Sequence, residues 1–139
     1  MAETKSHPQF NVILLAIIFD PAKRKILIAR RKHDDDIPNL TWQFPEGRLR
    51  YGLDVDKLIK TKVKEKTGYD VKNLGTIFSK VYPEKENLLG IYFLCEAFGG
   101  EAKPSDDFVE LKWVSPDEIE EHFKTSFHPH LKEYLMNLK

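Results

Sequence analysis

A scarcity of cysteine is the first feature that narrows the class of this chain of 139 residues. Cys95 is the only cysteine, so no disulfide can form within the chain and a cysteine-rich metal site is excluded. A single thiol fits a reducing compartment, and we expect the protein to lie in the cytoplasm.

Net charge and long apolar runs are also lacking. Because 22 basic residues balance 22 acidic ones, no overall field draws the chain to nucleic acid or to an acidic membrane. The longest apolar stretch, residues 12–19, is too short to cross a bilayer, and residues 1–9 contain no signal-peptide core. We therefore expect no membrane partner, and the sequence carries no nucleic-acid signature.

The chain does contain enough apolar residues to build a core. Hydrophobic residues make up 41% of it and charged residues 32%, a balance typical of one globular domain at this length. We expect a flexible N-terminal segment at residues 1–9 and a single domain over residues 10–139.

Apolar runs between turn signals predict the strands. Residues 10–19 and 25–31 flank the turn pair Asp20-Pro21, which predicts a hairpin. Further strands are predicted at residues 41–44, 74–82, 88–98 and 108–114.

Three segments show the spacing or the caps of helices. The main one covers residues 54–67, with Asp54 as N-cap and Gly68 in the left-handed conformation that ends a helix. A capping sequence at Ser115 predicts a short helix up to Phe123, and residues 131–138 have a helical apolar face. This order of elements predicts an α+β fold.

The segment from Gly47 to Gly68 resembles the Nudix box of the MutT-like pyrophosphohydrolases. The box reads G-x5-E-x7-R-E-U-x-E-E-x-G-U, with U aliphatic, and the chain retains Gly47, Val63, Glu65 and Gly68 at the matching positions. The preceding Trp42-Gln43-Phe44-Pro45 resembles the family's W-x-F-P lead-in. The chain departs from the pattern at Glu46, Leu53, Thr61, Lys62, Lys66 and Tyr69.

The resemblance implies a Nudix fold, an α/β/α sandwich around a mixed β-sheet. It also implies a nucleotide-like substrate and Mg²⁺ or Mn²⁺ as cofactor, held by carboxylates on one face of the box helix. In the family, metal-bound water attacks a phosphorus of a nucleoside-diphosphate-linked compound.

Here the sign of charge on that face is reversed. Residues 47–68 contain seven basic side chains and three acidic ones, and only Glu65 remains of the four box glutamates. A divalent cation is strongly disfavoured beside ammonium groups, so we expect hydrolysis to be weak or absent.

The basic residues are candidates for binding a diphosphate directly. We single out Arg48, Arg50, Lys62 and Lys66 as phosphate-binding residues. In this hypothesis Lys62 and Lys66 replace the metal as a built-in cation. The alternative is a solvated helix face on which Glu65 forms ordinary surface ion pairs.

A relocated metal site is a further alternative. Glu65 with Glu46 as metal ligands, and Glu65 with Asp107 as catalytic residues, would allow an active hydrolase, with Glu110 as another nearby carboxylate. Metal ligation requires several oxygens in near-octahedral order, which a polar loop seldom supplies.

Other side chains have simpler explanations. His128-Pro129-His130 has zinc-like spacing, but a helix entry with Pro129 in the first turn explains it better. Aromatic residues can stack on a nucleobase, although most strand aromatics belong to the core. The candidates for stacking are Trp42, Tyr82, Tyr92 and Phe127.

Three functions therefore remain open, and whether the protein is an enzyme is one of the open questions. The first is a binder of nucleoside-diphosphate-linked ligands, and the second is an active metal-dependent Nudix hydrolase. The third is a protein-interaction domain that has kept only the fold. A homodimer is compatible with each of them.

Overall fold

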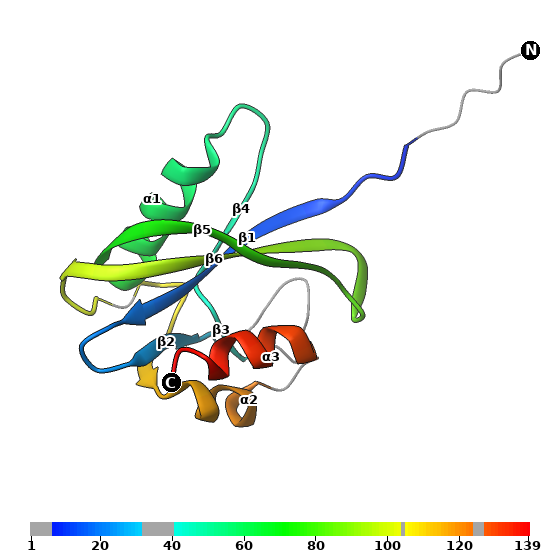
Figure 1. Cartoon of the computed structure of the whole chain (residues 1–139). Coiled ribbons are helices and arrows are strands. Elements are labelled where there is room, and N and C mark those ends of the chain that lie inside the picture. The colour runs from blue at the N-terminus through cyan, green and yellow to red at the C-terminus, as the bar shows by residue number, and fades with distance from the viewer. Residues whose placement is uncertain (1–6, 32–40, 104, 124–126) are drawn as a thin grey trace, which may run out of the picture.

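A seven-stranded mixed sheet forms the centre of the computed structural model, which describes residues 7–31, 41–103, 105–123 and 127–139 (Figure 1). The strands are β1 (Asn11–Asp20), β2 (Lys25–Arg30), β3 (Trp42–Gln43), β4 (Glu46–Arg48), β5 (Tyr69–Tyr82), β6 (Lys85–Gly100) and β7 (Glu110–Val114). The main path runs β3-β2-β1-β6-β5, β4 pairs with β1, and β7 pairs with β2. Only the β1–β6 pair is parallel among these, so the sheet is mixed.

Strand β1 lies in the middle of the main path of the sheet and is paired on both edges. One edge runs along β6, whereas the other is shared by two strands, with Leu14 opposite Gly47 of β4 and Ile18 opposite Leu27 of β2. Residues 13–18 are all buried, which explains why this strand is an unbroken apolar run. Alternate side chains enter two separate core clusters on the two faces.

Helices cover both faces of the sheet. They are α1 (Val55–Thr67), α2 (Ile119–His122) and α3 (Pro129–Met136), with the 3-10 turn η1 (Pro116–Glu118) before α2. In Figure 1, α1 lies on one side of the sheet and α2 and α3 lie on the other. The expected α/β/α sandwich is confirmed. No helix among the described residues combines the length and apolar character needed to span a membrane.

Most predicted elements are present, with shifted ends. The hairpin of β1 and β2 and the helix after Asp54 are confirmed. Strands β5 and β6 are longer than predicted, since their antiparallel ladder continues from Tyr82 opposite Lys85 to Tyr69 opposite Gly100. Backbone pairing thus extends the strands through polar residues that break the apolar pattern.

The C-terminal helix also differs in its boundaries. α3 begins at Pro129 and ends at Met136, where residues 131–138 were predicted. The cause at the N-terminal end is a side-chain cap, because Nδ1 of His128 accepts a hydrogen bond from the backbone N–H of His130 at 3.1 Å. The His-Pro-His sequence therefore begins a helix, as the sequence favoured. Residues 1–6 of the predicted flexible segment lie outside the described residues.

Candidate functional site

Helix α1 has caps at both ends that fix where its side chains project. The Asp54 carboxylate accepts a hydrogen bond from the N–H of Lys57 at 2.9 Å, and Gly68 closes the helix with a φ of 84°. The buried Thr67 hydroxyl donates to the Val63 carbonyl at 2.6 Å. Lys64 and Lys66 lie in the last turn, where positive charge is favourable toward the helix dipole.

The close approach of α1 to β4 depends on Gly47. A Cβ atom at Gly47 would lie 2.7 Å from Cγ of Lys62 and 3.5 Å from Cγ of Leu58, so a larger residue would push the helix away. The first glycine of the box therefore allows the aliphatic stem of Lys62 to pack directly on the strand.

Lys66 reaches the start of the same strand. Its ammonium group donates a hydrogen bond to the backbone carbonyl of Glu46 at 2.8 Å, and its nitrogen lies 5.8 Å from the ring centroid of Phe108. Phe108 is almost fully buried, so the ring forms a fixed wall beside the ammonium group.

Arg31 brings two carboxylates to this place. Its guanidinium lies 3.5 Å from the Glu46 carboxylate and 3.9 Å from that of Asp107, and it also lies over the ring of Phe108 at 5.7 Å. The side chains of Arg31 and Glu46 are only 16% and 14% exposed, so this ion pair is shielded from water. We call the group Arg31, Glu46, Lys66, Asp107 and Phe108 the Lys66 cluster.

The electrostatics of the cluster are balanced. Burial lowers the pKa of Lys66 from its ordinary value, and the carboxylates of Glu46 and Asp107 partly oppose this effect. The positive charges of Arg31 and Lys62 act in the same direction as burial. The cluster therefore contains two cations and two carboxylates at close range.

Glu65, the retained box glutamate, pairs with a residue outside this cluster. Its carboxylate lies 3.3 Å from the Lys62 ammonium group, in an i, i+3 pair whose side chains are 57% and 37% exposed. Such exposed pairs contribute at most about 1 kcal/mol. This geometry is the surface ion pair that the sequence offered as an alternative.

The side chains in this region do not fit a divalent metal as they are arranged. Within the described ranges, no group of three or more His, Cys, Asp or Glu residues is placed to hold an ion. Glu46 and Asp107 do converge, but on Arg31, and the Glu46 carbonyl oxygen accepts from Lys66. A hard divalent cation needs oxygens that are not already bound to cations, and here the ammonium and guanidinium groups occupy these oxygens and repel the cation.

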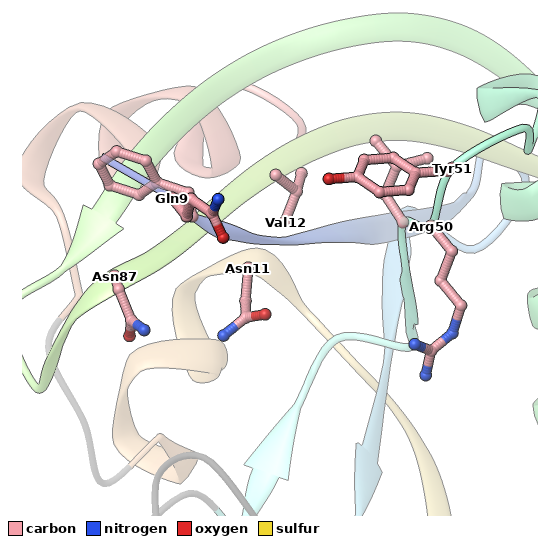
Figure 2. A pocket seen from close by; sticks show the side chains of 8 residues that line it. Gln9, Asn11, Val12, Arg50, Tyr51 and Asn87 are labelled. Atoms are coloured by element: carbon pink, nitrogen blue, oxygen red, sulfur yellow. The ribbon is translucent and has the colours of Figure 1, made fainter. Parts of the chain in front are cut away.

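The other end of β4 opens into a hollow (Figure 2). The hollow has a volume of about 550 Å³ and lies where β1 begins, where the chain leaves β4 and where β6 begins. Arg50 is the only charged residue among the eight described residues that line it. Its lining residues are Gln9, Phe10, Asn11, Val12, Leu49, Arg50, Tyr51 and Asn87.

The four predicted phosphate-binding residues are therefore distributed along the box. Lys62 and Lys66 lie one helical turn apart on α1, whereas Arg50 lies in the hollow beyond the end of β4. Arg48 pairs with Ile13 and lies on β4 next to Gly47, so its side chain alternates to the face away from α1. The structure brings only the two lysines together.

The aromatic candidates are divided between core and surface. Tyr82 and Tyr92 are buried, and their hydroxyl oxygens lie 3.2 Å apart in a hydrogen bond. Burial raises the pKa of Tyr92 to about 12, so the phenol stays neutral. These two rings are core residues, whereas Trp42 and Phe127 are partly buried at the edge of the same cluster.

Sequence reasoning missed two members of the Lys66 cluster. Arg31 appeared only as the end of a predicted strand, and Phe108 as the start of another. Neither belongs to the box. The Arg-to-carboxylate contacts depend on chain segments that are distant in sequence, and no local pattern shows them.

Comparison with known proteins identifies the family of this chain. The sequence matches the NUDIX domain family over residues 9–137. A MutT-like protein of Streptomyces ambofaciens is 26% identical over 121 residues, which cover 86% of this chain and 73% of that protein.

Solved structures show the same fold. An ADP-ribose pyrophosphatase from Streptococcus suis superposes with a TM-score of 0.64 at 22% identity, covering 95% of this chain and 90% of that one. A NUDIX hydrolase from Nitrosomonas europaea gives a TM-score of 0.75 at 16% identity, covering 96% and 74%. With the family match over nearly the whole chain, this protein belongs to the NUDIX domain family.

Proposed function

We propose that this Nudix protein binds nucleoside-diphosphate-linked ligands without hydrolysing them efficiently. The observation that carries the proposal is the hydrogen bond from the Lys66 ammonium group to the Glu46 carbonyl. The box pattern has a glutamate at position 66, so a positive charge here replaces a negative one. The MutT-like relative and the ADP-ribose pyrophosphatase fold indicate the class of ligand.

Binding requires only positive charge and donors that face the ligand. One of the three ammonium hydrogens of Lys66 is used by Glu46, which leaves two as donors for phosphate oxygens. Lys62 is paired with Glu65 at the surface and can exchange that partner for a phosphate at little cost.

Hydrolysis requires more than binding. In the family, a divalent metal supplies the activated water and neutralises charge that develops on the phosphates. Here the nearest carboxylates, Glu46 and Asp107, are held by Arg31. The side chains that would have to hold the metal are thus engaged with protein cations, and we expect turnover to be slow or undetectable.

Calorimetry with ADP-ribose in EDTA tests the binding. The wild-type protein is expected to release heat at submillimolar ligand, and Lys66→Gln is expected to weaken the affinity at least tenfold. Lys60→Gln is the matched control, since Lys60 lies on the same helix and is paired with Asp56 at its surface. Absence of heat at millimolar ADP-ribose would refute the proposal and leave an interaction domain as the better description.

One observation favours an active hydrolase as second candidate. The carboxylates of Glu46, a candidate metal ligand, and Asp107, a candidate catalytic residue, both lie within 4 Å of the Arg31 guanidinium. Phosphate release from a panel of nucleotides in Mn²⁺ would establish this activity, and its loss in Glu65→Gln would assign it to the box. We expect release to stay at the background of a heat-denatured sample.

A further inference from the structure

Lys66 is held more firmly than a surface lysine of a helix. Its ammonium group has a backbone carbonyl as hydrogen-bond acceptor, an aromatic wall on one side and two carboxylates close enough to influence it. Its stem begins in the last turn of α1, which the Gly68 cap fixes at the C-terminal end. The position of this positive charge is therefore set by backbone and core.

The groups around Lys66 are the kind that bind a hard cation. They are one carbonyl oxygen and two carboxylates, contributed by β4 and by the segment between β6 and β7. These oxygens would favour a divalent ion if the protein did not already direct an ammonium group and a guanidinium toward them. The site thus has oxygens suited to a metal ion, but the protein already places its own ammonium and guanidinium groups beside them.

We propose that the Lys66 ammonium group is a built-in cation that closes this oxygen-lined site to divalent metal, and that a carboxylate at position 66 opens it. Position 66 is one at which the box pattern has a glutamate, so Lys66→Glu restores the family residue. The inference concerns the binding of a divalent metal ion without any nucleotide, so its outcome is separate from that of the proposed function.

The physical basis is the exchange of one cation for another. Lys66→Glu removes a positive charge from the cluster and adds an oxygen ligand beside the Glu46 carbonyl that Lys66 now contacts. Arg31 remains and still neutralises part of Glu46 and Asp107. The change therefore leaves an excess of negative charge that a divalent ion can balance.

Binding of Mn²⁺ to the full chain, followed by electron paramagnetic resonance, is the direct test. The wild-type protein is expected to leave Mn²⁺ free up to millimolar concentration. Lys66→Glu is expected to bind at least tenfold more tightly, with one ion per chain. Lys66→Gln removes the charge and adds no carboxylate, so its affinity for Mn²⁺ should lie between those of the wild type and Lys66→Glu.

Lys60→Glu is the control for added negative charge, because it makes the same change on α1 at a residue paired with Asp56. Equal Mn²⁺ affinity of Lys60→Glu and Lys66→Glu would overturn the proposal, as would tight binding by the wild type. If Lys66→Glu does not fold, Lys66→Gln decides: affinity above wild type supports the proposal, and affinity equal to wild type overturns it. Circular dichroism of each variant establishes folding.

Discussion

Positive side chains lie near both ends of strand β4, but their surroundings differ. At its start, Lys66 and Arg31 are surrounded by a carbonyl, two carboxylates and a buried ring. Beyond its end, Arg50 lines an open hollow with amide and aromatic neighbours and no acidic one among the described lining residues. Charge alone therefore does not define a phosphate site, because the partners decide how much of each charge is available.

The largest difference between the ends should appear in stability. Arg31→Met leaves Glu46 and Asp107 with Lys66 as the only cation of the cluster, so unfolding free energy should fall by about 2–4 kcal/mol. Arg50→Met at the open end should change it by no more than about 0.5 kcal/mol. Urea denaturation of both variants measures the contrast, and similar losses would show that the Arg31 contacts contribute little.

Packing at the start of β4 gives the next effect. Gly47→Val places atoms where the Lys62 stem lies 2.7 Å from the ideal Cβ position, so α1 must shift. We expect a loss of about 1–3 kcal/mol from overpacking. Thermal unfolding measures it, and an unchanged melting temperature would mean that the helix adapts without cost.

The pH dependence of Lys66 sharpens the same comparison. Because burial lowers its pKa in the folded protein, the unfolded state binds more protons at this group between the lowered value and about 10.5. Across that window its contribution to stability rises with pH. The unfolding free energy of wild type relative to Lys66→Gln should therefore increase toward pH 10.5 in urea titrations, and a flat difference would contradict the burial of the ammonium group.

Ligand affinity should change in the opposite direction. An anionic ligand bound by the Lys66 ammonium group loses affinity once that group gives up its proton, so ADP-ribose binding should decline before pH 10.5. Glu46, Asp107, Arg31 and Lys62 face this group and are all present in Lys66→Gln, which lacks only the Lys66 ammonium group and should show a flatter profile. Calorimetry at a series of alkaline pH values measures both curves.

The smallest effect is expected at the exposed helix face. Lys62→Gln removes the ion pair with Glu65, whose partners are 37% and 57% exposed, and should cost at most about 0.5 kcal/mol. The matched change Glu65→Gln should cost as little. A loss above about 1 kcal/mol in either variant would assign this pair a structural role.

The main helix and the central strand could be predicted from the sequence because they depend on local signals. The caps at Asp54 and Gly68 and the apolar spacing between them predicted α1 within one residue of its observed start. The apolar run of residues 10–19 likewise predicted the strand β1. Propensity, periodicity and capping act over a few residues, so they can be recognised in the local sequence.

The site was accessible only in part. The sequence showed that the box had become basic and that Glu65 was isolated, and it offered the Lys62 pair as a surface interaction. It did not distinguish Lys66 from Lys62, although one is held by Glu46 and the other is exposed. That difference depends on Arg31, Asp107 and Phe108, which the fold brings in from outside the box.

One edge of β1 changes its partner strand, from β4 at Leu15 to β2 at Ile18. This change of partner affects how proteins of this fold can diversify. Side chains from separate segments meet beside this fork, and of the Lys66 cluster only Glu46 belongs to a strand ladder, opposite Leu15. Their polarity can therefore be exchanged by a few substitutions while the strands keep their register. A lineage can lose one chemistry and acquire another at this junction without having to rebuild its architecture.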